Sequence, residues 1–213
     1  MTKAADFIRA NTVLTTHQMV PEIRLWLATE ITPIWQATED WMSVNGTAPP
    51  FWAFAWPGSV AMARHILDNP EVATGRRVLD FAAGCGLAGI ACGKVKATDV
   101  EAAEIDPVAI AAAELNAAVN QTTIRTSSGD IVGSACQWDL ILCGDVCYEA
   151  PMTSHIMPWL KKMAATAEVW IADPGRNYLP SVGLEPFARY IVPTSLELED
   201  REERAVVLYR LEP

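Results

Sequence analysis

Three glycines and one acid form the most informative chemical pattern in the sequence. Gly84, Gly86 and Gly89 have the spacing GxGxxG, and Glu104 lies 20 residues after Gly84. Glycines let the backbone approach a ligand closely, and a carboxylate at this distance can accept hydrogen bonds from ribose hydroxyls. The pattern therefore predicts a site for a ligand that contains adenosine. By itself it does not separate NAD from other adenosine cofactors.

Two further acids lie near the ends of expected strands. Asp80 comes directly before the glycine loop, and Asp130 follows the third expected strand. A carboxylate at Asp80 can orient the loop and lie near a cofactor's ammonium group, whereas a loop that binds pyrophosphate gains nothing from an anion there. Asp130 is placed to accept a hydrogen bond from an adenine amino group, unless it is simply an acid in a surface turn. Together these acids favour S-adenosylmethionine over NAD.

An acid and an aromatic residue follow the fourth expected strand. Asp145 comes directly after Gly144, and Tyr148 follows three residues later. We expect Gly144 beside the cofactor as well. Ligands of open parallel sheets bind beyond the carboxyl ends of the strands, so both side chains should face the cofactor's reactive end. A carboxylate can hold an amine, and an aromatic face tolerates a methylated ammonium. The pair predicts methyl transfer to an amine. The alternatives are that Asp145 is only a turn residue and that Tyr148 only packs in the core.

The elements that must position these residues follow an alternating pattern after Pro57. Short apolar runs rich in β-branched residues alternate with alanine-rich helical stretches, which is typical of βαβ units on a parallel sheet. Asp106 and Pro107 fit the N-cap and first position of a helix. We predict strands at 77–81, 100–104, 123–127, 139–143 and 168–172, and helices at 58–68, from the glycine loop to 92, at 107–120 and at 151–166.

Two more extended runs complete the predicted sheet, at 188–197 and 204–211, with the acidic turn 199–203 between them. A parallel return needs a crossover of a dozen or more residues, so these strands must pair antiparallel. The predicted fold is α/β, with five parallel strands and an antiparallel C-terminal hairpin in a Rossmann-like sheet. We expect residues 57–213 to form the catalytic domain and residues 1–56 to form a tryptophan-rich arm that contributes to the pocket.

Composition argues against several classes of protein. The chain of 213 residues carries 16 Lys and Arg against 26 Asp and Glu, a net charge of −10, which argues against nucleic-acid binding. No apolar run is long enough to span a membrane, and three scattered histidines lack metal-ligand spacing, so we expect neither a membrane span nor a metal site. The N-terminus has no leader pattern, which predicts a cytoplasmic protein, and five cysteines without a CxxC pair predict reduced thiols.

The glycine loop, its acids and the terminal hairpin resemble the class I, seven-β-strand methyltransferases. This resemblance implies S-adenosylmethionine as the cofactor, with Asp80, Gly84, Gly86, Glu104, Asp130 and Gly144 at its site. One departure is visible, because Ala82 stands where that family commonly has its first glycine. We expect a tighter loop at Ala82 and an intact site.

The acid, two residues and an aromatic residue after the fourth strand resemble protein lysine methyltransferases. Further segments resemble the family that modifies the β subunit of electron-transfer flavoprotein, and they lie at 11–12, 21–25, 51–58, 67–70, 105–107 and 173–176. Mitochondrial members carry a presequence, so its absence here suggests a bacterial relative. The resemblance implies methylation of a protein lysine in that subunit. A ribosomal protein as substrate and a nicotinamide-like small amine remain alternatives, as do an inactive protein-binding module and an NAD-dependent oxidoreductase.

Two residues outside these motifs complete the predicted site. Trp56 ends an aromatic run and either presses on the cofactor or packs in the core. Arg176 leaves the fifth strand and either contacts an acidic face of the substrate or pairs with a surface acid.

Overall fold

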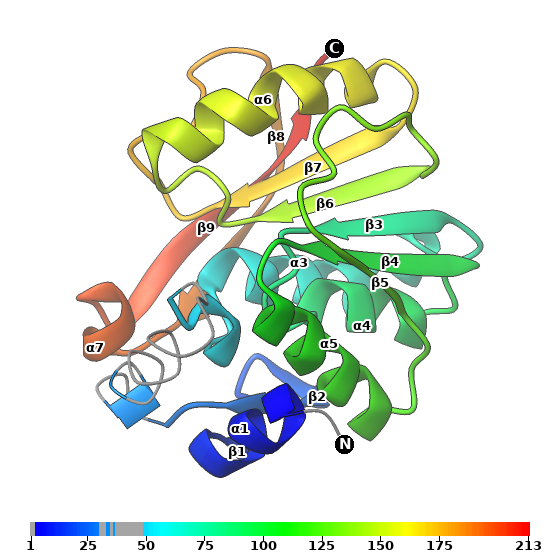
Figure 1. Ribbon diagram of the computed structural model, residues 1–213. Helices are drawn as coiled ribbons and strands as arrows, with labels where there is room; N and C mark the ends of the chain where they lie inside the picture. Colours follow the sequence, from blue (N-terminus) through cyan, green and yellow to red (C-terminus); the bar gives the residue numbers. More distant parts are fainter. Residues whose placement is uncertain (1–2, 30–32, 35, 37–48) are drawn as a thin grey trace.

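A seven-stranded sheet lies at the centre of the structure, a computed structural model that describes residues 3–29, 33–34, 36 and 49–213 (Figure 1). The strand order is β5-β4-β3-β6-β7-β9-β8, in which β3 to β7 are parallel and β9 is antiparallel to both β7 and β8. The predicted architecture is therefore confirmed. The strands are β3 Arg77–Phe81, β4 Asp99–Glu104, β5 Arg125–Ser128, β6 Leu140–Gly144, β7 Glu168–Asp173, β8 Leu184–Pro193 and β9 Glu203–Leu211.

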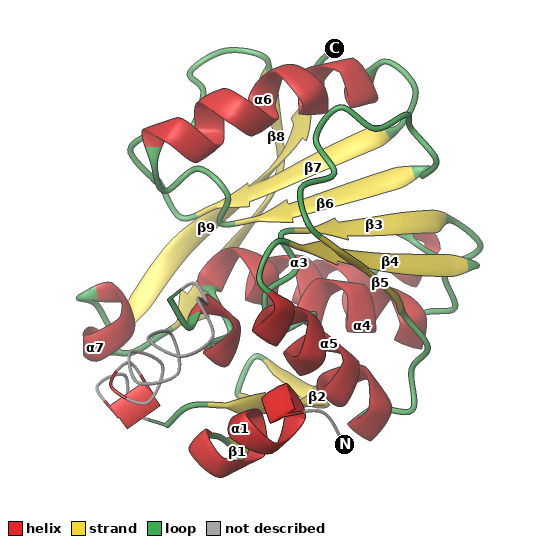
Figure 2. Ribbon diagram, viewed as in Figure 1, coloured by secondary structure: helices red, strands yellow, loops and turns green. Residues whose placement is uncertain are grey.

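Helices cover both faces of this sheet (Figure 2). On one face lie α3 Pro57–Asp68, α4 Leu87–Lys94 and α5 Pro107–Val119, and on the other lies α6 Ala150–Ala164. The central strand β6 is apolar along its length because both of its faces are covered. Leu140 and Leu142 pack on the side of α3 and α4, whereas Ile141 and Cys143 pack on the side of α6.

Helix α5 begins where the sequence predicts. The Asp106 side chain accepts a hydrogen bond from the Val108 backbone N–H at 2.8 Å, and Pro107 occupies the first helical position. Proline costs nothing there because its missing N–H has no partner inside the helix. This cap fixes the end of the segment that follows β4, and with it the position of Glu104.

The N-terminal arm contains elements that the sequence pattern does not indicate. Helix α1 Lys3–Asn11 precedes an antiparallel hairpin of β1 Val13–His17 and β2 Val20–Leu27. The hairpin docks on α5, because the Trp26 backbone N–H donates to Asn116 Oδ1 at 2.7 Å. Trp35 and Trp41, which belong to the expected tryptophan-rich arm, lie outside the described residues.

The connection between β8 and β9 differs from the prediction. The sequence predicts a strand to residue 197 followed by an acidic turn, but β8 ends at Pro193 and a short helix, α7 Leu196–Glu199, follows the Ser195 cap. Glu199 is buried and not part of a solvated turn, because two arginine side chains neutralise its carboxylate. Sequence pattern alone cannot show these long-range ion pairs.

No described helix is long and apolar enough to cross a membrane. No group of three or more histidine, cysteine, aspartate or glutamate side chains within the described ranges is arranged to hold a metal ion.

Candidate active site

The glycine loop joins β3 to α4 through three residues with left-handed backbone conformation. The φ angles of Ala82, Gly84 and Gly86 are 53°, 54° and 76°. A methyl group added at Gly84 would meet nothing within 4 Å, so the loop leaves open space on that side. One added at Gly86 would lie 3.0 Å from the Ala113 Cβ, so this glycine lets α5 pack closely. Ala82 adopts a conformation that favours glycine, at a cost in strain.

Glu104 ties the end of β4 to this loop. Its Oε1 accepts a hydrogen bond from the Gly84 N–H at 2.8 Å, and its Oε2 accepts one from the Ile105 N–H at 3.0 Å. Burial raises the pKa of the Glu104 carboxyl, although these hydrogen bonds act in the opposite direction. An ionised carboxylate has about four acceptor positions, so Glu104 keeps acceptor capacity for a hydroxyl group of a ligand.

Asp80 is buried at the end of β3, beneath the same loop. Its Oδ2 accepts a hydrogen bond from the Gly89 N–H, 2.7 Å away, in the first turn of α4. Burial raises the pKa of this carboxyl to about 7. Asp80 therefore holds α4 against β3 and orients the loop from below.

Asp145 lies just beyond β6 in a left-handed conformation, with φ 55°. Its side chain is only 7% exposed and is held from two sides. The Gly58 backbone N–H, at the start of α3, donates to Oδ2. Arg176 donates to Oδ1 from Nε at 3.1 Å and from Nη2 at 2.7 Å. Burial raises the pKa of Asp145 to about 6, against the opposing effect of Arg176.

Three aromatic side chains, Phe51, Trp56 and Tyr148, form an aromatic group from the segments that precede α3 and follow β6. The Phe51 ring centroid lies 5.7 Å from that of Tyr148 and 5.9 Å from that of Trp56. The Trp56 indole N–H donates to the Phe51 carbonyl at 2.8 Å, which fixes the two rings. Phe51 and Tyr148 are 38% and 41% exposed, so part of the aromatic group lies at the surface.

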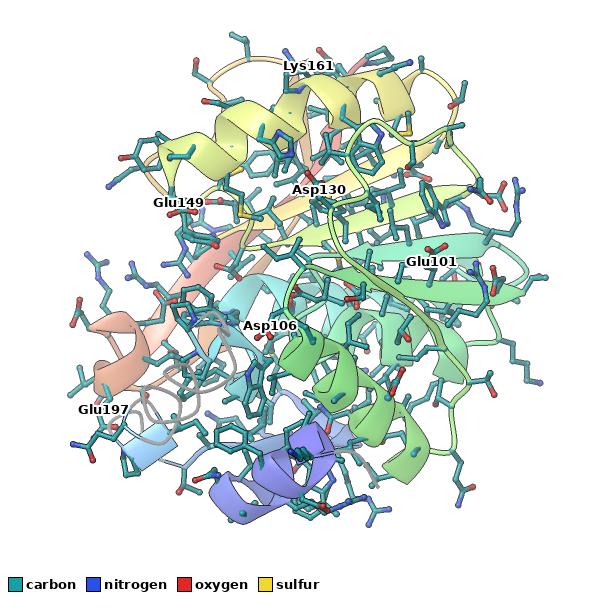
Figure 3. The ribbon with its side chains drawn as sticks, in the orientation of Figure 1. Glu101, Asp106, Asp130, Glu149, Lys161 and Glu197 are labelled. Atoms are coloured by element: carbon teal, nitrogen blue, oxygen red, sulfur yellow. The ribbon has the colours of Figure 1, made fainter. Side chains whose placement is uncertain are left out.

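This aromatic group is connected to Asp145 through the chain itself. Trp56 immediately precedes α3, whose Gly58 donates to the carboxylate, and Tyr148 follows Asp145 by three residues. Figure 3 labels Glu149, the residue after Tyr148, at the start of α6. One end of the aromatic group is thus attached to the helix that holds the acid, and the other end to the segment that carries the acid.

Three other predicted site residues have different surroundings. A methyl group at Gly144 would lie 2.6 Å from the Ser59 Oγ, so Gly144 allows α3 to approach β6. Asp130 is exposed and bonds to His155 of α6 at 2.7 Å, and Figure 3 shows it beside α6 and apart from Asp106. The guanidinium of Arg176 is engaged by Asp145 and Glu199. The predicted cofactor and substrate contacts of these three residues stay predictions.

Two residues that take part in this arrangement lack a chemical signal in the sequence. Gly58 is the first donor of α3, and Glu199 lies in an acidic stretch that reads as a solvated turn. A hollow of about 350 Å³ lies elsewhere, between the arm and the connection that follows β8. None of the predicted site residues lines it, so this hollow is not the centre of the predicted chemistry.

Comparison with known proteins identifies the family. The chain is 35% identical over 217 residues to the electron transfer flavoprotein beta subunit lysine methyltransferase of Xenopus laevis, across 98% of this chain and 87% of that protein. It is 33% identical to the Homo sapiens protein of the same name, across 93% of this chain and 77% of the other. The chain belongs to the electron transfer flavoprotein beta subunit lysine methyltransferase family. The resemblance expected from the sequence is confirmed.

Other comparisons agree with this methyltransferase family. Residues 60–148 match the family model described as ribosomal protein L11 methyltransferase (PrmA), a range that runs from α3 to Tyr148. Among solved structures, magnesium protoporphyrin IX methyltransferase (ChlM) from Synechocystis PCC 6803 with bound SAM has a TM-score of 0.55 at 13% identity. That match covers 84% of this chain and 93% of the other, and it supports the class I methyltransferase fold. The family assignment argues against the alternative that the chain is an NAD-dependent oxidoreductase.

Proposed function

We propose that this methyltransferase uses S-adenosylmethionine to methylate a lysine of the electron-transfer flavoprotein β subunit. The observation that carries the proposal is the buried Asp145 carboxylate, held after β6 by Gly58 and Arg176 and followed three residues later by Tyr148, whose ring packs on Phe51. The glycine loop that Glu104 holds follows the neighbouring strand β3. Relatives across most of the chain are named for that reaction. The substrate is therefore a protein.

The residues of the loop fit the adenosine part of the cofactor. The open side of Gly84 and the remaining acceptor capacity of Glu104 suit close approach and binding of a ribose hydroxyl. Asp80 and Gly86 keep the loop in place, and we assign contacts with the cofactor to Trp56, Asp130 and Gly144 as well. When bound, S-adenosylmethionine supplies a methyl group activated by its sulfonium charge.

The chain's own residues must orient a neutral lysine amine. A lysine pKa of about 10.4 means that deprotonation at pH 7 costs roughly 4.6 kcal/mol, and an apolar surrounding lowers that cost. The aromatic group provides such a surrounding and tolerates the methylated, charged product. The oxygens of Asp145 already accept from Gly58 and Arg176, which favours orientation of the amine by this carboxylate over proton removal.

The arm takes part in this proposal as one wall of the pocket. Phe51 and Trp56 belong to residues 1–56, whereas the loop, Asp145 and Tyr148 belong to the methyltransferase domain at 57–213. The arm thus contributes aromatic surface to a site whose other groups come from the sheet. The cytoplasmic compartment and bacterial origin stay predictions.

Transfer of a tritiated methyl group tests the proposal. The purified chain is incubated with labelled S-adenosylmethionine and, separately, with the flavoprotein, with ribosomal protein L11 and with nicotinamide. Asp145→Asn serves as the site variant, and its folding is checked by circular dichroism. We expect label on a lysine of the flavoprotein β subunit, identified by mass spectrometry and reduced at least about 100-fold in the variant.

The other outcomes each contradict a defined part of the proposal. Label on ribosomal protein L11 alone would replace the substrate, in line with the family match over residues 60–148. Label on nicotinamide alone would make the chain a small-molecule enzyme. Full transfer by Asp145→Asn would remove the proposed role of this carboxylate.

A further inference from the structure

Glu199 is a buried acid that the proposed function does not use. Its side chain is 1% exposed and lies at the end of α7, in the connection between β8 and β9. Arg176 contacts it at 2.6 Å, and Arg204 contacts it at 2.8 Å. A carboxylate buried this deeply is costly unless it is paired, so both arginines are needed to hold it.

Arg176 connects Glu199 directly to Asp145. Its Nη2 lies 2.6 Å from Glu199 Oε1 and 2.7 Å from Asp145 Oδ1, and its Nε also donates to Asp145. Both carboxylates therefore share one planar guanidinium. Because the guanidinium is rigid, a carboxylate on one edge restricts the orientation of the other edge.

The backbone under Arg176 is fixed separately. Asp173, at the end of β7, accepts hydrogen bonds from the Gly175 N–H at 2.7 Å and from the Arg176 N–H at 2.6 Å. This turn sets where the Arg176 side chain begins but not how its distal end is rotated. Glu199 is the partner that fixes the distal end on the side away from Asp145.

We propose that Glu199 is a positioning residue for methyl transfer, which acts by holding the Arg176 guanidinium so that the Asp145 carboxylate keeps its place between Gly58 and Arg176. The inference rests on the proposed function of Asp145. It also gives Arg176 a role inside the enzyme in place of contact with the substrate. The connection between β8 and β9, far from the motifs in the sequence, thereby becomes part of the active site.

The electrostatic surroundings of Asp145 support a test by pH. The charged groups that act on its carboxylate are Arg176, which lowers its pKa, and Glu199, which raises it; the thiol of Cys147 is a further titratable neighbour. Arg176 acts on Asp145 more strongly than Glu199 does, so release of the Arg176 guanidinium in a Glu199 variant should move the pKa of Asp145 upwards. Loss of the Glu199 charge with Arg176 still in place would move it downwards. A loss of folding alone would not produce such a shift.

The experiment compares Glu199→Gln with wild type in steady-state methylation of the substrate that the tritium-transfer experiment identifies. We expect kcat to fall roughly 10- to 100-fold, with KM for S-adenosylmethionine unchanged within about twofold, because displacement of an orienting group lowers the rate of transfer. In the plot of log kcat against pH, the acidic break should move to higher pH; a move to lower pH would show that Arg176 keeps its contact with Asp145 and would overturn the inference. Glu202→Gln is the matched control, since Glu202 is exposed in the same connection and should behave as wild type.

A double-mutant cycle separates positioning from a general structural effect. If Glu199 acts through Asp145, then Glu199→Gln should cause no further loss in the Asp145→Asn background, measured in long incubations. Equal losses in both backgrounds, or wild-type kcat and pH dependence in Glu199→Gln, would overturn the inference. Urea titration shows whether Glu199→Gln is folded at the assay temperature. If it is not folded, Glu199→Asp, which keeps the charge, is compared with wild type in the same way.

The outcomes also distinguish this inference from the proposed function. Loss of transfer in Asp145→Asn together with a silent Glu199→Gln would reject only the role of Glu199. Full transfer in Asp145→Asn would reject the proposed role of Asp145, and the positioning role with it.

Discussion

The backbone of Gly58 touches the carboxylate of Asp145 so closely that no side chain fits between them. A methyl group at Gly58 would lie 2.7 Å from the Ala172 carbonyl oxygen and 2.8 Å from the Asp145 nitrogen. The Gly58 N–H donates to the carboxylate from the first turn of α3, where the helix dipole favours negative charge. The first helix of the domain and the proposed catalytic acid are therefore one packed unit.

Gly58→Ala should damage both stability and activity. We expect the free energy of unfolding to fall by about 2 kcal/mol or more, because the atoms that the methyl group meets are largely backbone and cannot move aside. Gly93→Ala is the control, since its methyl group meets the Thr122 side chain, which can rotate. Urea unfolding and methylation rates measure both variants. Similar stability of the two variants would contradict the packing described here.

The glycine loop permits a paired test of backbone strain. Ala82→Gly should stabilise the protein by about 0.5 kcal/mol, because relief of the left-handed conformation exceeds the added freedom of the unfolded chain. Gly86→Ala should destabilise it by more than about 1 kcal/mol, since it adds both strain and a close contact with Ala113. Thermal unfolding at one pH measures both. A destabilising Ala82→Gly would show that Ala82 is not strained.

Much of this loop and its sheet is predictable because the signals are local. The predicted strand 77–81 coincides with β3, and the Asp106 cap with Pro107 fixes the start of α5. The surroundings of Arg176 are less predictable. The sequence offers a surface acid as its partner, but the structure gives it two buried acids from other parts of the chain. Such pairings depend on the completed fold.

Asp80 should make stability depend on pH. Its pKa is about 7 in the folded state and near 3.8 when exposed, so the folded protein binds the proton more tightly. Stability should therefore fall as pH rises from about 4 to 7 and then level off. We expect the drop in unfolding free energy between pH 5 and pH 8 to be smaller in Asp80→Asn by at least about 2 kcal/mol.

The Asp80 comparison uses differences between the two proteins. Asp145, whose pKa is raised to about 6, contributes a similar drop in unfolding free energy to wild type and to Asp80→Asn, so its contribution cancels. Urea titrations of wild type and Asp80→Asn at each pH give the values. Equal drops would show that Asp80 does not carry this dependence.

Tyr148 should act through its ring face. Tyr148→Phe keeps the contact with Phe51, so we expect kcat/KM for the protein substrate within about threefold of wild type. Tyr148→Ala removes the apolar surface and should lower kcat/KM at least about 10-fold, a loss of roughly 1.4 kcal/mol in the transition state. Initial rates at varied substrate concentration measure both. An equally large loss in Tyr148→Phe would assign the role to the hydroxyl group instead.

The arm shows the other limit of prediction from sequence. The hairpin of β1 and β2 is held by α5 residues some 90 positions later, including the bond from Trp26 to Asn116. Its burial is set by those partners and not by its own pattern. The aromatic residues at 51–56 attract attention in the sequence, but their contact with Tyr148 depends on the sheet that lies between them in the chain.

The position of β9 has a consequence for synthesis of the protein. This strand lies between β7 and β8, although it follows both in the chain. While the ribosome has completed only residues 1–193, β7 is an uncovered edge of apolar residues, open to pairing with another nascent chain. The exposure of β7 ends only when the chain that contains Glu199 and Arg204 has emerged. We therefore expect β7 to be covered, and the surroundings of Asp145 to assemble, at nearly the same moment of translation.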